Sequence, residues 1–230
     1  MVLSKERKTE LIEFMLEVGV LRFGDFVTKS GRNTPYFLNT GHYSKGSQLE
    51  TLSQFYAEAV HTGFGDRAEN LYGPAYKGIP LVIATSMALF RTYGQDASVT
   101  FNRKEAKDHG EGGVLVGEDY KGASEPVGVV LVEDVITAGT SVRESMELLR
   151  SLPNVKVIGL VVSVDRMEKG AGALSAASEI REKYEIETVS MVNLTDILTY
   201  LREGADVGRG VATPEQLGKI EEYYRLHAGE

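Results

Sequence analysis

The sequence has no cysteine, so neither a disulfide framework nor thiol chemistry is available to it. No apolar run approaches the roughly 20 residues that a membrane-spanning helix needs. The N-terminal segment 1–16 lacks the signal-peptide order of basic, apolar and small residues, and instead fits an amphipathic helix. Together these absences favour a cytoplasmic protein with no membrane partner.

The charge argues against a second class of partner. The formal net charge of −8 disfavours non-specific binding to nucleic acid or to an anionic surface, although it is compatible with a local basic pocket. With 230 residues, of which 42% are hydrophobic, the chain can bury a sizeable core. We therefore expect a folded protein without a nucleic-acid partner.

Apolar strands and helical patterns alternate through the middle of the chain. Strands are expected at 97–102, 127–133, 155–164 and near 187–192, with a short strand at the start of 69–80. Helices are expected at 81–94, 141–152 and near 174–184. Strands that are apolar on both faces and separated by helices predict an α/β fold, with a parallel central sheet and flanking helices.

The two ends of the chain fall outside this alternation. We expect a single domain over 1–230, with a core at about 66–192 and a small hood formed by about 1–65 and 193–230. Ligands of such sheets bind beyond the carboxyl ends of the strands, so the hood would cover the ligand side.

The stretch VVLVEDVITAGTS, residues 129–141, carries the clearest chemistry. A buried strand delivers Glu133 and Asp134 to the ligand edge of the sheet, and a hydroxyl-rich turn follows. Unpaired N–H groups and the dipole at the next helix N-terminus would bind a phosphate. Ser141 and Glu144 fit a capping box there. The carboxylates would take a sugar diol, a hydrated Mg²⁺ or both; the alternative is a plain helix cap after a buried strand.

This stretch resembles the phosphoribosyl-diphosphate signature of type I phosphoribosyltransferases. The resemblance implies that the turn grips the 5-phosphate of the donor and that the acidic pair holds the ribose hydroxyls. The family often has two aspartates where this chain has Glu133 and Asp134. The donor-binding residues implied here are Glu133, Asp134, Val135, Ile136, Thr137, Ala138, Gly139, Thr140 and Ser141.

A second stretch, FNRKEAKDHGEGG at 101–113, places basic side chains ahead of several glycines. Such a loop suits a lid that closes over a polyanion, although most charged runs are solvated surface loops. It resembles the catalytic loop of orotate phosphoribosyltransferase. The resemblance makes Lys107, His109 and Asp134 catalytic. It also places the diphosphate of the donor against Arg103, Lys104, Lys107 and His109.

Three further segments resemble the same family in the same order. TKSGRNTPYFLNTG (28–41) is similar to its N-terminal substrate segment, and GPAYKGIP (73–80) is similar to its diphosphate-binding loop. SVDRMEKGAG (163–172) is similar to the strand end that carries its orotate-contacting arginine.

These segments complete the implied substrate site. They add Lys29, Tyr76 and Lys77 to the donor site. The segment 41–46 departs from the family sequence, and we assign it no function. The implied orotate contacts are Lys29, Phe37, Leu38, Thr137 and Arg166.

The resemblance implies transfer of the 5-phosphoribosyl group from 5-phosphoribosyl 1-diphosphate to orotate, which forms orotidine 5′-monophosphate and diphosphate in pyrimidine biosynthesis. It implies Mg²⁺, held mainly by the diphosphate and ribose of the substrate, with no direct protein ligand assigned. It also implies a homodimer in which the loop 103–113 acts in the neighbouring site.

Two alternatives remain at this stage. One is a phosphoribosyltransferase for another nucleobase, since the stretch at 129–141 reads only the phosphoribosyl half of the reaction. The other is a regulator that senses phosphoribosyl diphosphate. Arg166 and the basic loop favour orotate, and a regulator should carry a DNA-binding domain or a basic face, neither of which is evident in this acidic sequence.

Overall fold

The computed structural model of the chain describes residues 2–27, 31, 33–107, 113–118, 120–206 and 211–229. Residues 104–107, 113, 205 and 206 are described by their backbone alone. The predictions for Lys29 and His109 therefore lie outside the described residues, as do those for the side chains of Lys104 and Lys107.

A six-stranded sheet with the order β5-β4-β3-β6-β7-β8 forms the centre of the described structure. Its strands are β3 (Asn70–Gly73), β4 (Ser98–Lys107), β5 (Gly113–Gly117), β6 (Val127–Ile136), β7 (Val155–Asp165) and β8 (Glu187–Asn193). Neighbouring strands pair in parallel, except that β5 is antiparallel to β4. The predicted parallel sheet is confirmed, with one antiparallel edge strand that the sequence pattern did not reveal.

Both faces of the sheet are buried, as the apolar run in β6 predicts. Val130 and Val132 belong to one hydrophobic cluster, whereas Val129 and Leu131 belong to the other. Side chains alternate along a strand, so only a run that is apolar at every position can fill both clusters.

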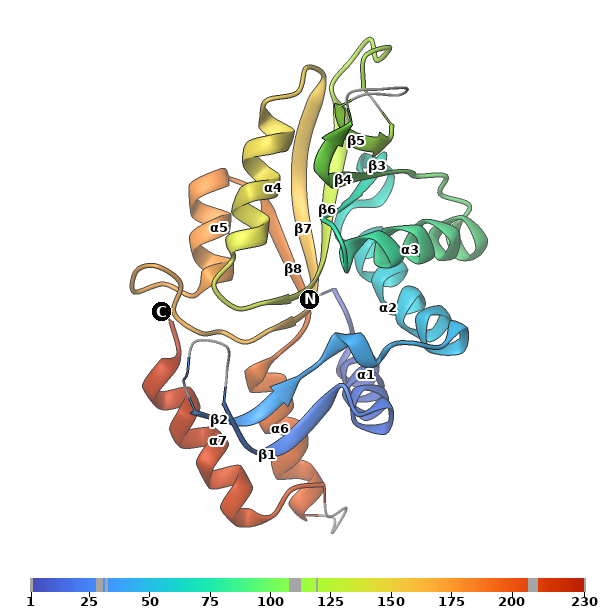
Figure 1. Cartoon of the computed structure of the whole chain (residues 1–230). Coiled ribbons are helices and arrows are strands. Elements are labelled where there is room, and N and C mark those ends of the chain that lie inside the picture. Colours follow the sequence, from blue (N-terminus) through green and yellow to red (C-terminus); the bar gives the residue numbers. More distant parts are fainter. Residues whose placement is uncertain are drawn as a thin grey trace.

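Helices cover both faces of the sheet (Figure 1). Helices α1, α2 and α3 lie on one face, and α4 and α5 lie on the other. Short 3₁₀ helices precede and follow α2. The bounds are α1 (Lys5–Val18), η1 (Thr40–His42), α2 (Gly46–Phe64), η2 (Gly65–Arg67), α3 (Gly78–Tyr93), α4 (Thr140–Arg150) and α5 (Ala176–Tyr184).

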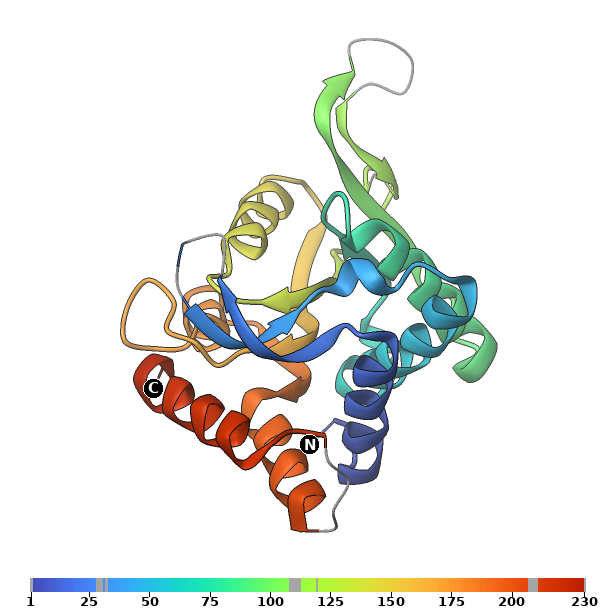
Figure 2. The same ribbon diagram turned by 60° about the horizontal axis from the view of Figure 1, so that its bottom comes forward.

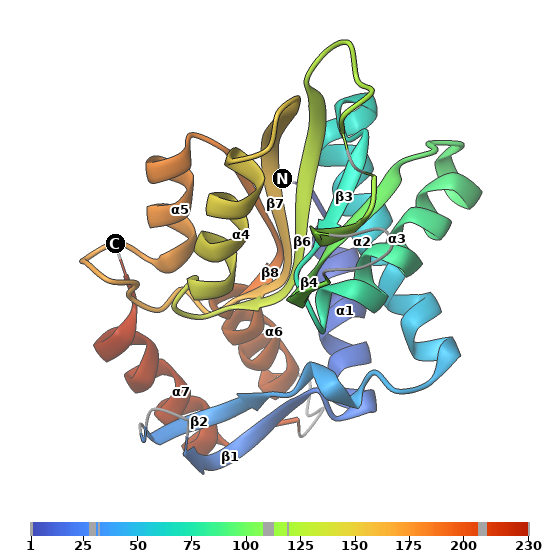
Figure 3. The ribbon, with the colours of Figure 1, turned by 45° about the horizontal axis from the view of Figure 1, so that its top comes forward.

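A third group of elements lies beyond the carboxyl ends of β6 and β7 (Figures 2 and 3). It contains an antiparallel ribbon of β1 (Leu21–Val27) and β2 (Asn33–Leu38), with α6 (Leu194–Asp206) and α7 (Pro214–His227). Helix α7 packs against β2. Helix α2 falls within the range expected for the hood but packs on β7 and β8 instead. The division into core and hood stays a prediction.

The segment 101–113 differs from the expected loop. Its first residues continue β4 as far as Lys107, and Gly113 begins β5, so the two strands form a hairpin. Phe101 pairs with Val116 and Asn102 with Leu115. Pairing with β5 covers the edge of β4, which would otherwise leave a row of unpaired backbone groups. Figure 2 shows this hairpin projecting from the body of the molecule.

A glycine in β7 tests how tightly α2 packs on the sheet. A Cβ built on Gly159 would lie 2.1 Å from the ring of Phe64, so Gly159→Ala forces the ring or the strand to move. We expect a loss of about 1–3 kcal/mol in the free energy of unfolding. Urea denaturation at one fixed protein concentration measures it.

Gly218→Ala is the matched control, because Gly218 is exposed within α7 and an added Cβ meets nothing within 4 Å. We expect this change to stabilise the protein by up to about 1 kcal/mol. Equal stabilities for the two variants would contradict the close packing of Phe64 on the sheet.

Candidate active site

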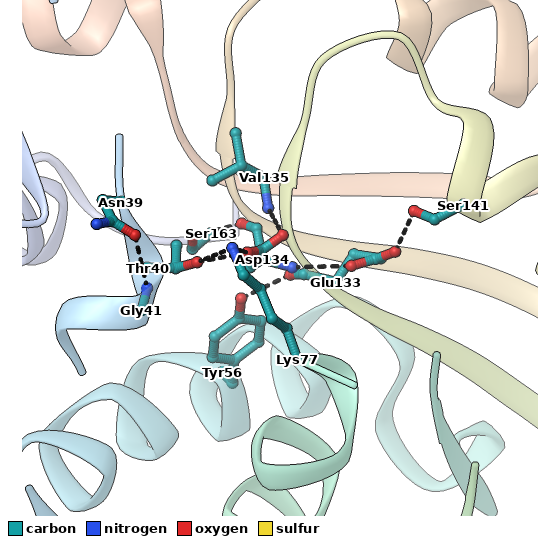
Figure 4. Close-up of polar contacts among 10 residues, drawn as sticks. All are labelled: Asn39, Thr40, Gly41, Tyr56, Lys77, Glu133, Asp134, Val135, Ser141 and Ser163. Carbon is teal, nitrogen blue, oxygen red and sulfur yellow. Dashed lines mark hydrogen bonds and ion pairs between the residues drawn. The ribbon is translucent and has the colours of Figure 1, made fainter. Parts of the chain in front are cut away.

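Two adjacent carboxylates near the end of β6 point to opposite sides of the strand (Figure 4). The hydroxyl of Ser141 on α4 donates to Oε1 of Glu133, and the backbone N–H of Asp134 donates to Oε2 at 3.3 Å. Burial raises the pKa of Glu133, while the hydrogen bond from Ser141 acts to lower it. The surroundings therefore compensate only part of the cost of burying this carboxylate.

Asp134 faces a lysine and a threonine from two other segments (Figure 4). Its Oδ2 accepts from Nζ of Lys77 at 3.0 Å and from the hydroxyl of Thr40. Nζ of Lys77 also donates to the Thr40 hydroxyl at 2.9 Å. Oδ1 of Asp134 accepts from the backbone N–H of Val135 at 2.7 Å. The side chain of Lys77 is 62% exposed and that of Asp134 is 15% exposed, so the lysine reaches into the site from its open side.

Two buried hydroxyl contacts fix the backbone beneath the carboxylates. The hydroxyl of Tyr56 on α2 donates to the carbonyl of Glu133 at 2.6 Å, and that of Ser163 on β7 donates to the carbonyl of Asp134 at 2.6 Å. Sequence analysis missed Tyr56, Ser163 and Thr40. Thr40 stood inside a segment quoted for its family resemblance, but nothing in the sequence linked it to Asp134.

The turn after β6 has the form expected for anion binding, with one correction. Helix α4 begins at Thr140, and its N-cap is Gly139 in the left-handed conformation with φ of 72°, so the predicted capping box of Ser141 and Glu144 is wrong. The hydroxyl of Ser141 is instead directed to Glu133. Thr137 is exposed on the turn. The first N–H groups of α4 are thus free of a side-chain cap, and the positive end of the helix dipole can meet a phosphate.

Arg143 fixes this turn from behind. It donates to the carbonyl of Ala138 and, at 2.8 Å, to Glu179 on α5. Glu179 in turn accepts from the N–H groups of Ala171 and Gly172 at 3.1 and 2.6 Å. One carboxylate therefore ties the anion-binding turn to the segment that follows Arg166.

Two pockets lie at this end of the sheet, one lined by Asp134 and the other by Ser141, the partner of Glu133. One, of about 140 Å³, is lined by Thr40, Lys77 and Asp134 together with apolar side chains of α2 and α3. The other, of about 330 Å³, is lined by Ala75, Arg103 and Ser141 among others. Arg103 lies on β4 and donates to the carbonyl of Leu115 at 3.2 Å, so its side chain runs along the hairpin. Tyr76 is 66% exposed on the neighbouring loop.

Three of the residues expected to contact the base, Phe37, Leu38 and Arg166, lie on β2 and directly after β7. Arg166 is buried and pairs with Glu168, which is also buried. Phe37 stacks on Phe26 with ring centres 5.4 Å apart. Leu38 is partly buried against the hydrophobic core. The structure thus places a buried cation and an aromatic pair on the elements expected to read the base, and their roles remain predictions.

Comparison with known proteins agrees with this geometry. The family model described as a phosphoribosyl transferase domain matches residues 42–188. This match covers more than half of the chain, so the chain belongs to the phosphoribosyltransferases. The chain is also 49% identical over 226 residues to the orotate phosphoribosyltransferase of Clostridium beijerinckii, covering 98% of this chain and 100% of that one.

Solved structures show the same relationship. The orotate phosphoribosyltransferase of Francisella tularensis has a TM-score of 0.81 at 36% identity, over 96% of this chain and 100% of that chain. The UMP synthase of Leishmania donovani shares the fold, with a TM-score of 0.73 at 21% identity over 96% of this chain and 43% of that chain. This protein therefore belongs to the orotate phosphoribosyltransferases, as its sequence predicts.

Gly139 tests the anion-binding turn. Valine is strained at a φ of 72°, and a Cβ there would lie 2.9 Å from Cδ1 of Ile180, so Gly139→Val should displace the N–H groups of the turn. We expect the affinity for the donor and for the nucleotide product to fall by roughly 10- to 100-fold. Titration calorimetry measures both.

Gly122→Val is the control, because Gly122 is exposed and an added Cβ meets nothing within 4 Å. It should bind both ligands normally. Normal nucleotide affinity in a folded Gly139→Val variant would reject the turn as the phosphate site.

Proposed function

We propose that the protein transfers the 5-phosphoribosyl group from 5-phosphoribosyl 1-diphosphate to orotate, in the cytoplasm, and that the residues around the end of β6 perform the transfer. The single observation that carries the proposal is the acidic pair Glu133 and Asp134, set between the helix turn at Gly139 and the cation of Lys77. Within the described residues, no helix is long and apolar enough to cross a membrane.

The donor binds along this edge. The turn at Thr137–Thr140 takes the 5-phosphate through its backbone N–H groups. Asp134 and Glu133 then lie toward the ribose hydroxyls. As the bond to diphosphate breaks, the ribose carbon becomes cation-like, and nearby carboxylates stabilise that charge in the transition state more than in the ground state.

Cations receive the departing diphosphate. Lys77 gives up its contact with Asp134 and moves to the diphosphate, which its exposure permits. Arg103 approaches from β4, and Lys104, Lys107 and His109 follow it in the sequence. Negative charge develops on the leaving group, so these cations act where they lower the barrier.

We propose Mg²⁺ as the cofactor, coordinated mainly by diphosphate and ribose oxygens. Among the described residues, no group of three or more His, Asp or Glu side chains is arranged to hold a metal ion. When bound, Mg²⁺ supplies positive charge to the diphosphate.

Orotate binds opposite the donor. The planar guanidinium of Arg166 suits the oxygens of a flat, carboxylate-bearing ring. Phe37 and Leu38 wall the ring, Thr137 borders it from the anion-binding turn, and Lys29 completes the site. A different nucleobase would share the donor half and would lack the oxygen pattern that Arg166 reads. No observation favours a sensing regulator.

We propose that the enzyme acts as a homodimer. Helix α3 exposes a stripe of large apolar side chains at helical spacing, with Ile83, Met87 and Phe90 at 42%, 62% and 59% exposure. The partner that fits is a second copy of this chain. The hairpin of β4 and β5 projects from the body, so it can reach the acidic site of a neighbouring subunit (Figure 2).

The reaction itself is tested by absorbance. With 5-phosphoribosyl 1-diphosphate and Mg²⁺, the protein should consume orotate, whereas adenine, guanine and uracil should be poor acceptors. Excess chelator should abolish turnover and added Mg²⁺ should restore it. Preference for a purine would overturn the choice of base, and full activity in chelator would remove the metal from the mechanism.

Hybrid dimers test the shared site. Lys107→Ala and Asp134→Ala homodimers should each be inactive, because each site then lacks one essential group. If the hairpin acts in the partner's site, a hybrid has one doubly damaged site and one intact site. Random exchange at equal amounts then leaves roughly a quarter of all sites intact.

Exchange is confirmed separately with differently tagged subunits, and each variant mixed with itself is the control. Activity that stays at the level of the single variants after confirmed exchange would mean that the hairpin serves its own subunit.

A further inference from the structure

A buried carboxylate lies two residues beyond Arg166, in the segment that follows β7 and bridges to Ala228. Oε1 of Glu168 accepts from Nε of Arg166 at 2.7 Å and from the hydroxyls of Tyr223 and Tyr36 at 3.0 and 3.4 Å. Glu168 is only 3% exposed. A buried carboxylate and a buried guanidinium each need the other, because either alone would carry a large desolvation cost.

The same cluster fixes the plane of the guanidinium. Cζ of Arg166 lies 4.6 Å from the ring centre of Tyr36, and the ring of Tyr36 meets that of Tyr223 edge to face at 5.8 Å. The ring face of Tyr36 and the carboxylate of Glu168 together hold the planar guanidinium of Arg166 in one orientation.

One edge of the guanidinium is directed at Glu168. Nη2 of Arg166 lies 2.6 Å from Oε1 of Glu168, but it makes no hydrogen bond of good geometry in the structure, and it is buried. Nη2 is enclosed beside this carboxylate, so an oxygen of a ligand has to approach the guanidinium from another side.

Backbone hydrogen bonds also connect the end of helix α7 to the segment that follows β7. The N–H of Lys169 donates to the carbonyl of His227 at 3.0 Å, and the N–H of Gly229 donates to the carbonyl of Met167 at 2.9 Å. These two backbone hydrogen bonds fix the end of α7, and with it Tyr223, relative to the segment that contains Glu168.

We infer that Glu168 and Tyr223 are positioning residues that orient the guanidinium of Arg166 toward the acceptor base, so that helix α7 takes part in base selection. The inference rests on the proposed role of Arg166 in binding orotate. Glu168 determines which edge of the guanidinium remains available to the base, and the hydroxyl of Tyr223 holds Glu168 in place. A planar base with a carboxylate then finds donors already oriented, without the entropy loss of ordering them.

Tyr223→Phe tests this with the smallest change, because it removes one hydroxyl and keeps the ring. We expect kcat/KM for orotate to fall by about 5- to 30-fold. The KM for 5-phosphoribosyl 1-diphosphate should stay within about twofold. Tyr224→Phe, at the next position of α7, is the matched control and should leave both values unchanged. Glu168→Gln should reproduce the orotate defect, because the amide keeps the shape and loses the charge.

A double-mutant cycle separates positioning from a general structural role. In an Arg166→Ala background, Tyr223→Phe should cause little further loss, since the group that it orients is gone. The four proteins are compared at saturating donor, with thermal melts to confirm that each is folded.

The outcomes distinguish the two proposals. If Arg166→Ala weakens orotate use but Tyr223→Phe behaves like Tyr224→Phe, the positioning role is wrong and the role of Arg166 stands. A full Tyr223→Phe penalty in the Arg166→Ala background, or an equal loss for both substrates, would also overturn it. If Arg166→Ala leaves orotate kinetics intact, both proposals fail.

Discussion

The candidate site depends on placing two adjacent carboxylates near the end of a buried strand. An ionised carboxylate taken from water costs several kcal/mol unless it is paired or hydrogen-bonded. Strand geometry separates the two, so Glu133 meets the hydroxyl of Ser141 while Asp134 meets Lys77. Burial still raises the pKa of Glu133, so these contacts compensate only part of the cost of burying its carboxylate.

This constraint couples the site to the whole fold. Asp134 contacts Thr40, which follows β2 and lies 94 positions away in the chain, and its carbonyl accepts from Ser163 on β7. The carbonyl of Glu133 accepts from Tyr56 on α2. The segment after β2, helix α2 and strand β7 must therefore all be folded before both acidic residues have their hydrogen-bond partners. The acidic pair is therefore formed by tertiary structure, although its position is visible in a short stretch of sequence.

Sequence reasoning succeeded where the signal was local. The apolar runs of β6 and β7 and the turn at Gly139 follow from neighbouring residues, and so do the helices between the strands. Sequence reasoning failed where a residue had a tertiary partner instead of the expected local one. Ser141 fitted a helix-capping pattern, but its hydroxyl donates to Glu133. The β4–β5 hairpin looked like a loop because its charges hid the alternation of a strand. Glu168 was quoted within a motif, yet its partner Tyr223 lies 55 positions away, where local patterns give no information.

The two halves of the site use different physics, which explains how one fold can serve several bases. The donor half presents backbone N–H groups and partly exposed charges, which suit any phosphoribosyl donor. The proposed acceptor half presents Arg166, whose charge is largely balanced by its ion pair with Glu168. A balanced cation attracts anions weakly but keeps its directed donors, so it discriminates by hydrogen-bond geometry more than by charge. On the proposed role of Arg166, choice of base depends on how the guanidinium is held, and therefore on residues that need not touch the base.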